Sequence, residues 1–269
     1  MARRTKTRRR TAPAASPAAR VGLNPLRNWA APSARIFWAI GVLVLLTLAA
    51  YSNSFSGVFV FDDLSSIAEN PTIRQLWPIG QCPPPCRLSH SLNQQIHGRP
   101  LLNLSFAVNY ALGGLAVVGY HALNLAVNLA NALLLFGLLR RTFALPVLRE
   151  KFGDHALALA FAIALLWAVH PLQSASVTYI VQRAESLVSL FYLLTLYCMV
   201  RGVESGKPAG WYAGAVLACL LGMSTKEVMV TAPVVVLLYD WMFLAGSLTE
   251  ALRRRGLIGG LTSTCDSVE

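Results

Sequence analysis

Two adjacent carboxylates, Asp62 and Asp63, are the residues whose spacing most directly suggests chemistry. Carboxylate oxygens bind divalent cations, and a single carboxylate can act as a general base on a hydroxyl group. The same residues have a structural alternative, because Asp63 or Ser65 could cap a short helix that runs on through Ile67. The acidic pair therefore predicts either a catalytic or cation-binding site, or simply the start of a helix.

Three isolated cations, Arg99, Arg183 and Lys226, lie at the ends of apolar segments further along the chain. Arginine can bind phosphate through two hydrogen bonds and lysine as a point charge, so each could hold a phosphate group. Each could instead extend to lipid headgroups, which is the commoner role. Glu185 and Glu227 lie beside two of these cations as candidate ion-pair partners.

A histidine next to a proline, His170-Pro171, follows another apolar segment. Proline has no backbone N–H, so we expect it to break the helix at this point. A lone histidine is more often a hydrogen-bonded structural residue than a catalytic one, and we therefore expect His170 to support a site.

Two cysteines, Cys82 and Cys86, are separated by three prolines. If their loop is extracytoplasmic, a short disulfide is the favoured interpretation. Free thiols are a second interpretation. Metal binding is a third and weaker one, because no histidine or further cysteine lies at a finger-like spacing.

The composition indicates which solvent surrounds these residues. Of the 269 residues, 55% are hydrophobic and only 13% are charged, whereas about 25% of a typical soluble domain is charged. Intrinsic disorder is excluded for most of the chain because disorder requires low hydrophobicity. The composition therefore predicts an all-α, polytopic membrane bundle.

Six apolar segments are predicted to span the membrane, each near the roughly 20 residues that a crossing needs. They cover residues 36–52, 119–139, 156–174, 184–200, 210–223 and 228–245.

The basic residues predict the orientation of these spans. Residues 1–35 contain nine basic residues and no acidic one, and we expect them to form a disordered cytoplasmic tail before an uncleaved signal anchor. With six spans, 18 basic residues lie inside and five outside; adding a seventh span at Leu101–Val118 would make the split 11 to 12. The positive-inside rule therefore favours a long outer loop over residues 53–118, in which Leu101–Val118 forms an interfacial or re-entrant helix.

This topology gathers the candidate residues on one face of the membrane. The acidic pair lies in the first outer loop, and the outer turns contain His170, Arg183 and Lys226. A polar cluster at one end of a helical bundle is a functional-site hypothesis by default. The basic tail could bind nucleic acid or anionic lipid, but its position before a span favours a membrane anchor, and no nucleic-acid partner is expected.

Several short motifs occur in a fixed order along the chain. They are Phe59-Val60-Phe61-Asp62-Asp63, Gly98-Arg99-Pro100-Leu101, Gly119-Tyr120-His121-Ala122-Leu123-Asn124, His170-Pro171-Leu172-Gln173, Val181-Gln182-Arg183-Ala184-Glu185-Ser186-Leu187 and Ser224-Thr225-Lys226-Glu227. The ordered set resembles the membrane half of bacterial tetratricopeptide-repeat membrane proteins. These are relatives of the transmembrane-and-tetratricopeptide O-mannosyltransferases of the GT-C glycosyltransferase class.

The resemblance implies a GT-C-like membrane module over residues 36–255, in the inner membrane of a cell. Such an enzyme would transfer a sugar from a polyprenyl-phosphate donor to Ser/Thr hydroxyls of a protein on the extracytoplasmic face. Asp62 or Asp63 would be the base, or would position a divalent metal ion where the family uses one. From charge and topology, we expect Arg99, Arg183 and Lys226 to neutralise the donor phosphate.

The C-terminal segment departs from the pattern of the family, which continues with further spans and a tetratricopeptide array. Within residues 256–269, the ending 262–269 is polar where another span is expected to develop. We therefore expect this segment to be an aberrant or truncated tail.

Two other functions are compatible with a polytopic membrane chain. A transporter would be expected to place polar groups at the middle of the bilayer and to show internal repeats, and neither feature is evident. A non-catalytic membrane anchor for a tetratricopeptide-repeat partner is the other alternative.

The predicted topology can be tested by cysteine labelling. Single cysteines introduced at Asn93 and at Arg149 should react with a membrane-impermeant maleimide from opposite sides of the membrane. Labelling of both positions from the same side would overturn the predicted span count.

Overall fold

The computed structural model describes residues 33–79, 81 and 98–245, and in this part of the chain it is helical with no strands. The all-α prediction is thereby confirmed. The predictions made for residues 1–32, for Cys82 and Cys86, and for the segment 256–269 lie outside the described residues.

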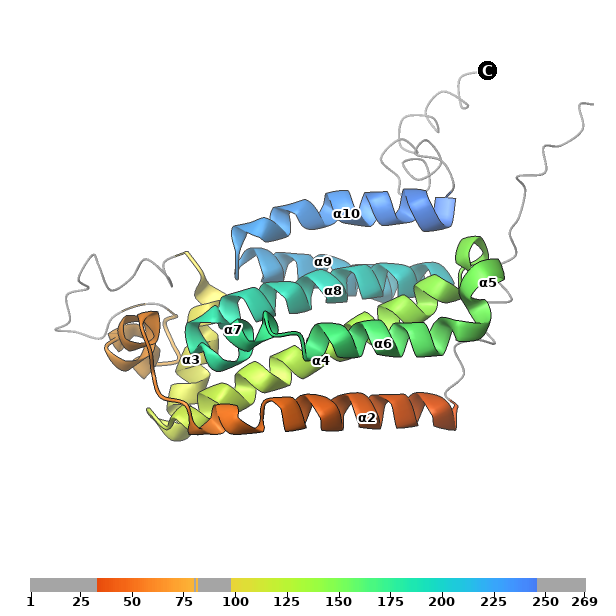
Figure 1. The fold of residues 1–269 in the computed structure, drawn as a ribbon. Coiled ribbons are helices and arrows are strands. Elements are labelled where there is room, and N and C mark those ends of the chain that lie inside the picture. The colour runs from red at the N-terminus through yellow and green to blue at the C-terminus, as the bar shows by residue number, and fades with distance from the viewer. Residues whose placement is uncertain (1–32, 80, 82–97, 246–269) are drawn as a thin grey trace, which may run out of the picture.

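Six helical segments run lengthwise through the bundle (Figure 1). Their principal helices are α2 (Ala34–Ala50), α4 (Val117–Ala144), α6 (Ala156–Ala168), α8 (Arg183–Glu204), α9 (Pro208–Met223) and α10 (Ala232–Tyr239). Short helices connect them: η1 (Ser52–Ser56), η2 (Leu64–Ala68), η3 (Pro71–Arg74), α3 (Pro100–Gly113), α5 (Pro146–Phe152), η5 (Gly153–His155), α7 (Gln173–Thr178), η6 (Ile180–Gln182), η7 (Glu227–Thr231) and η8 (Asp240–Ala245).

Five continuous helical stretches of the described chain are long and apolar enough to cross a membrane. They are Ala34–Ser56, Val117–Ala144, Pro146–Ala168, Ile180–Glu204 and Glu227–Leu244. The fifth predicted span corresponds to α9, which is apolar but only 16 residues long. It packs against α8 and runs between the same two ends of the bundle (Figure 1).

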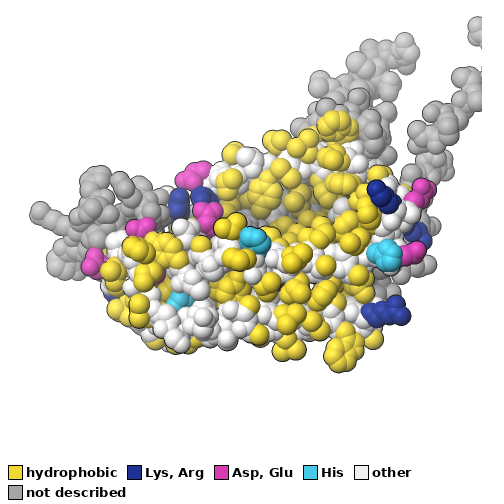
Figure 2. Space-filling view, in the orientation of Figure 1, with side chains coloured by type: hydrophobic (Ala, Val, Ile, Leu, Met, Phe, Trp, Pro, Cys, Tyr) yellow, Lys and Arg dark blue, Asp and Glu magenta, His cyan; other side chains and the backbone are white. Residues whose placement is uncertain are grey.

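The two ends of the bundle differ in their connections (Figure 1). The α7 end carries α3 and α7, together with the ends of α2, α6 and α9 and the starts of α4 and α8. The α5 end carries α5 and the opposite ends of the long helices. Hydrophobic side chains dominate the middle of the surface in Figure 2, and the charged side chains visible there lie towards the two ends, as expected for a bundle in lipid.

Helix α3 occupies the region expected to form an interfacial or re-entrant helix. It ends at Gly113, and the next residue, Gly114, has a φ of 58°, which a residue with a Cβ rarely adopts. This glycine allows the chain to turn sharply before α4 begins at Val117. The pair therefore forms a helical corner instead of one continuous span.

Small residues allow α6 to pack closely against its neighbours. Ala160, Ala164 and Ala168 recur every four residues, are fully buried, and pack against Leu43 of α2 and Phe136 of α4. In a membrane, small side chains let helix backbones approach and gain van der Waals contact.

Buried asparagines on α4 satisfy the backbone where other helices are interrupted. Asn124, Asn128 and Asn131 share one face, because they are spaced four and three residues apart. The Nδ2 atom of Asn128 donates to the carbonyl of Ala168, where α6 ends, and that of Asn131 donates to the carbonyl of Ser186 (2.9 Å). A free carbonyl inside the bilayer is costly, so Asn128 stabilises the end of α6 near Pro171, and Asn131 ties α4 to the first turn of α8.

Candidate functional site

The acidic pair is divided by the fold, because its two side chains have opposite environments. Asp62 is exposed, whereas Asp63 is fully buried. The preceding residue, Phe61, has a φ of 48°, an uncommon conformation for a non-glycine residue. This turn places one carboxylate on the surface and the other inside.

Asp63 links the first loop to the start of α8. Its Oδ2 accepts a hydrogen bond from the backbone N–H of Val60 (3.2 Å), and its Oδ1 accepts one from the N–H of Val181 (2.8 Å). Burial raises the pKa of the Asp63 carboxyl above its ordinary value, although the backbone hydrogen bonds oppose this shift. Asp63 lies at the position before η2, but its side chain makes no capping bond there. The proposed capping role is therefore replaced by a bond across the fold.

Asp62 has a partner that the sequence analysis did not identify. The backbone N–H of Asp62 donates to the hydroxyl of Tyr179 (3.2 Å), and the Tyr179 ring meets the Phe61 ring edge-on, with 6.4 Å between the ring centroids. Burial is the largest cause of a raised pKa at the Tyr179 hydroxyl. No sequence pattern links Asp62 with Tyr179, because the two residues are 117 positions apart and only the tertiary fold brings them together.

Arg183 lies inside the protein and is fully buried. Its Nε donates to Oδ1 of Asn124 (2.6 Å), its Nη1 to Oδ1 of Asn109 (2.7 Å), and its Nη2 to the carbonyl of Tyr120 (3.0 Å). The guanidinium also lies 4.7 Å from the ring centroid of Phe106. Arg183 thus joins α3, α4 and α8, and its predicted contact with a donor phosphate stays a prediction.

The other two predicted cations form ion pairs at the same end of the bundle. Lys226 pairs with Glu185 of α8, and Arg99 lies 3.9 Å from Glu227. The N–H of Leu101 donates to the carbonyl of Ser224 (3.4 Å), which ties the start of α3 to the turn after α9. The structure therefore brings together two segments that are more than a hundred residues apart in the sequence.

A groove of about 400 Å³ lies beside the Lys226–Glu185 pair. Its walls come from α4, α6, α8 and η7, and are lined by Leu135, Trp167, Glu185, Val188, Ser189, Tyr192, Leu193 and Val228. Most of these side chains are apolar, and Glu185 is the charged residue of the lining. In Figure 2 the same face is hollowed in its apolar middle, with acidic and basic side chains gathered towards the α7 end.

His170 is exposed at the α7 end, and its Nδ1 accepts a hydrogen bond from the N–H of Leu172 (3.2 Å). It thereby stabilises the turn between α6 and α7, in keeping with a supporting role.

The residues described do not include a group of three or more His, Cys, Asp or Glu side chains that could hold a metal ion. Both Asp63 oxygens accept backbone hydrogen bonds, so the acidic pair offers one exposed carboxylate rather than two.

The mouse protein O-mannosyl-transferase TMTC2 is 31% identical to this chain over 210 residues, which cover 72% of this chain and 23% of the mouse protein. The chain is a relative of the TMTC protein O-mannosyl-transferases. Mouse TMTC4 is also 31% identical over 210 residues, and fruit fly Tmtc3 is 32% identical over 219 residues; each match covers 72% of this chain. The resemblance predicted from the ordered motifs is thereby confirmed.

The chain spans only about a quarter of the length of the TMTC relatives that it matches: 23% of mouse TMTC2, 28% of mouse TMTC4 and 23% of fruit fly Tmtc3. No family model matches the chain. No solved structure matches it either.

The structural role of Arg183 can be tested by replacing it with methionine. Arg183→Met removes every guanidinium hydrogen bond and leaves oxygens of Asn109, Asn124 and Tyr120 without this donor, so we expect a loss of about 3 kcal/mol or more in the free energy of unfolding. Lys207→Gln, at an exposed cation, is the control and should change it by less than about 0.5 kcal/mol. Thermal unfolding in detergent measures both, and an Arg183→Met protein as stable as the wild type would contradict the role.

Proposed function

We propose that this chain is part of a membrane glycosyltransferase that transfers a sugar from a polyprenyl-phosphate donor to Ser/Thr hydroxyls of a protein. The names of its relatives support sugar transfer to protein. The observation that carries the proposal is the apolar groove with the Lys226–Glu185 pair at its charged edge. A polyprenyl-phosphate sugar has two matching parts: a long apolar chain, which would suit the groove, and an anionic headgroup, which would suit its charged edge.

The groove and the neighbouring cations suggest how the donor binds. The polyprenyl chain would lie along Val188, Tyr192 and Leu193 of α8. Lys226 would face the phosphate, because its ammonium group carries three donors and is only partly buried. Arg99 would approach from the start of α3, where its partner Glu227 is largely exposed to solvent.

Both cations are paired with carboxylates in the structure, so the donor phosphate would have to replace a carboxylate at each of them. A phosphate that enters would compete with Glu185 for Lys226 and with Glu227 for Arg99. Ion pairs that are exposed to solvent contribute little stability, so replacing the carboxylate partner with a phosphate costs little free energy. The carboxylates would then keep the cations in place when the donor is absent.

Asp62 is the residue that we assign as the base. Its carboxylate is exposed, and the Tyr179 hydroxyl orients its backbone. In the proposed step, the acceptor oxygen attacks the anomeric carbon, its proton passes to Asp62, and the bond between the sugar and the phosphate breaks. Polyprenyl phosphate leaves with the bonding electrons, and cations beside it stabilise that charge.

Asp63 and Arg183 are assigned as positioning residues. Asp63 holds the loop of Asp62 against Val181, two residues before Arg183. Arg183 holds the starts of α4 and α8 together from inside the protein. This arrangement favours indirect action of Arg183 on the donor site over contact with the phosphate.

The positive-inside distribution supports an orientation with the α7 end outside the cell and the N-terminus in the cytoplasm, in an inner membrane. The acceptor would then be a protein on the extracytoplasmic side.

The assignment of the base can be tested with Asp62→Asn. General bases contribute rate factors of about a hundredfold or more, so we expect sugar transfer to fall at least about a hundredfold without loss of folded protein. The assay follows a radiolabelled sugar from polyprenyl phosphate to a Ser/Thr peptide in membranes that contain the chain.

Glu69→Gln is the matched control, because Glu69 is an exposed carboxylate in the same loop. It should retain wild-type transfer. Wild-type turnover by Asp62→Asn would refute the assignment, and an equal loss in both variants would show that the effect is not specific to Asp62.

A further inference from the structure

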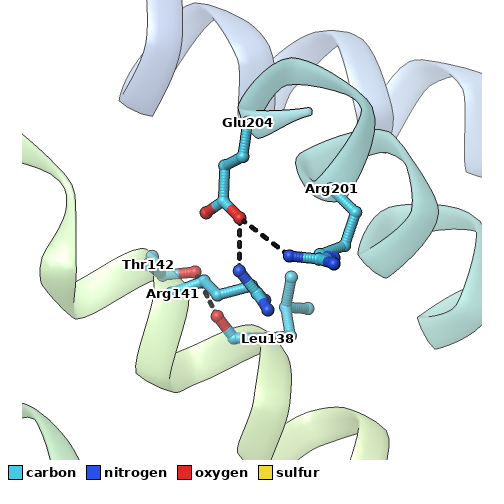
Figure 3. Close-up of polar contacts among 5 residues, drawn as sticks. All are labelled: Leu138, Arg141, Thr142, Arg201 and Glu204. Atoms are coloured by element: carbon cyan, nitrogen blue, oxygen red, sulfur yellow. Dashed lines mark hydrogen bonds and ion pairs between the residues drawn. The ribbon is translucent and has the colours of Figure 1, made fainter. Parts of the chain in front are cut away.

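A second charged group lies at the α5 end, far along the bundle from the proposed donor site (Figure 1), and Figure 3 shows part of this group in close-up. It consists of Arg140 and Arg141 on α4 and Arg201 and Glu204 on α8, and we refer to it as the basic cluster. Arg141 forms an ion pair with Oε2 of Glu204, and Nη1 of Arg201 lies 3.7 Å from the same oxygen. Two guanidinium groups therefore share one carboxylate.

The basic cluster has more positive than negative charge. Arg140 interacts electrostatically with Arg141, Arg201 and Glu204 and adds a third cation. Asp240, which is buried at the start of η8, brings a second carboxylate to this end of the bundle. Even when both carboxylates are counted, three guanidinium groups leave an excess of one positive charge.

Two of the guanidinium groups also have unused hydrogen-bonding capacity. The Nε atoms of Arg141 and Arg201 are buried and have no hydrogen-bond partner among the residues that the structure describes. A buried donor without an acceptor is unfavourable. An anion whose oxygens accept hydrogen bonds would satisfy such donors.

The surroundings of the basic cluster show where such an anion could enter. The side chain of Arg201 is 30% exposed, whereas that of Arg141 is 9% exposed, so access is from the Arg201 side. The Arg201 guanidinium lies 4.7 Å from the ring centroid of Trp211, and that of Arg141 lies 5.5 Å from the ring centroid of Tyr197. Tryptophan and tyrosine are the side chains that membrane proteins place at the level of lipid headgroups.

We propose that the basic cluster binds the phosphate of an anionic phospholipid headgroup in the leaflet at the α5 end. A phosphodiester brings one negative charge, which offsets the excess positive charge of the cluster and Asp240 together, and its oxygens accept the hydrogen bonds that arginine donates. Basic pockets between membrane helices bind anionic headgroups in this way. In a zwitterionic lipid the phosphate charge is balanced by the ammonium group of the same headgroup, so its electrostatic attraction to the cluster is weaker. The proposal holds whichever side of the membrane the α5 end faces.

The proposal predicts a lipid preference that depends on Arg201. The purified chain in detergent is titrated with phosphatidylglycerol or with phosphatidylcholine, and bound lipid is measured by native mass spectrometry. Wild type should bind phosphatidylglycerol more tightly. Arg201→Gln should weaken that binding about tenfold, which corresponds to the loss of one charge-assisted contact. Lys151→Gln removes an exposed charge at the same end and should retain wild-type binding.

Each outcome of this experiment decides the proposal. Equal binding of the two lipids by the wild type would overturn it whether or not the variants fold, and so would unchanged phosphatidylglycerol binding in a folded Arg201→Gln protein. Excess inorganic phosphate supplies the remaining test. Lipid retained in its presence supports a headgroup site, whereas displacement of the lipid would assign the cluster to free phosphate and overturn the lipid assignment.

Discussion

The hydrogen bonds of Asn124 are the interaction on which the α7 end depends. Its amide nitrogen donates to the carbonyls of Val177 and Ile180 (both 3.4 Å), where the chain passes from α7 to α8. Its amide oxygen accepts from Arg183. The buried Asn124 side chain thus donates to carbonyls at the break between α7 and α8 and accepts a hydrogen bond from the buried Arg183. Both groups are buried away from water, so these hydrogen bonds stabilise the interruption between α7 and α8.

That interruption is what makes a site feasible at this end. Helix α8 starts afresh after η6, so the N–H of Val181 is free to bond Asp63 and hold the first loop on the bundle. Asp62 then faces solvent next to Tyr179, while Lys226 and Arg99 meet their carboxylate partners across the ends of α8 and α3. The α5 end is built differently, since Arg141 and Arg201 share one carboxylate, Glu204, and lie against aromatic rings. The proposed division gives the α7 end to the sugar donor and the α5 end to membrane lipid.

The sequence predicted those features of the fold that depend on the surrounding lipid. Apolar length and composition predicted an all-helical membrane bundle, and they located five of the long helices, because burial in lipid is a property of whole segments. The ordered motifs predicted the relationship to the TMTC proteins. The helical stretch at the third predicted span is displaced towards the N-terminus: it begins at Pro146 and ends at Ala168, just before His170-Pro171.

The sequence was less informative about individual polar side chains. Asp62 and Asp63 are adjacent and chemically identical, yet one is exposed and the other is buried. The left-handed residue just before them, Phe61, sets this orientation, and no local pattern predicted it. Arg183 looked like other cations at the end of a span, and only the packing of α3 on α4 supplies the acceptors that enclose it. Tyr179 and the groove are likewise products of tertiary contact, which no local pattern encodes.

The central claim is that the groove beside Lys226 holds the polyprenyl-phosphate donor, and photoaffinity labelling tests it most directly. A polyprenyl-phosphate sugar with a photoactivatable group in its lipid chain is bound to the purified chain and irradiated, and the labelled residues are mapped by mass spectrometry. Labelling concentrated on Val188, Tyr192 and Leu193, and lost when unlabelled donor is added in excess, is the predicted result. Labelling at the α5 end that excess unlabelled donor abolishes, with no labelling along the groove, would contradict donor binding in the groove.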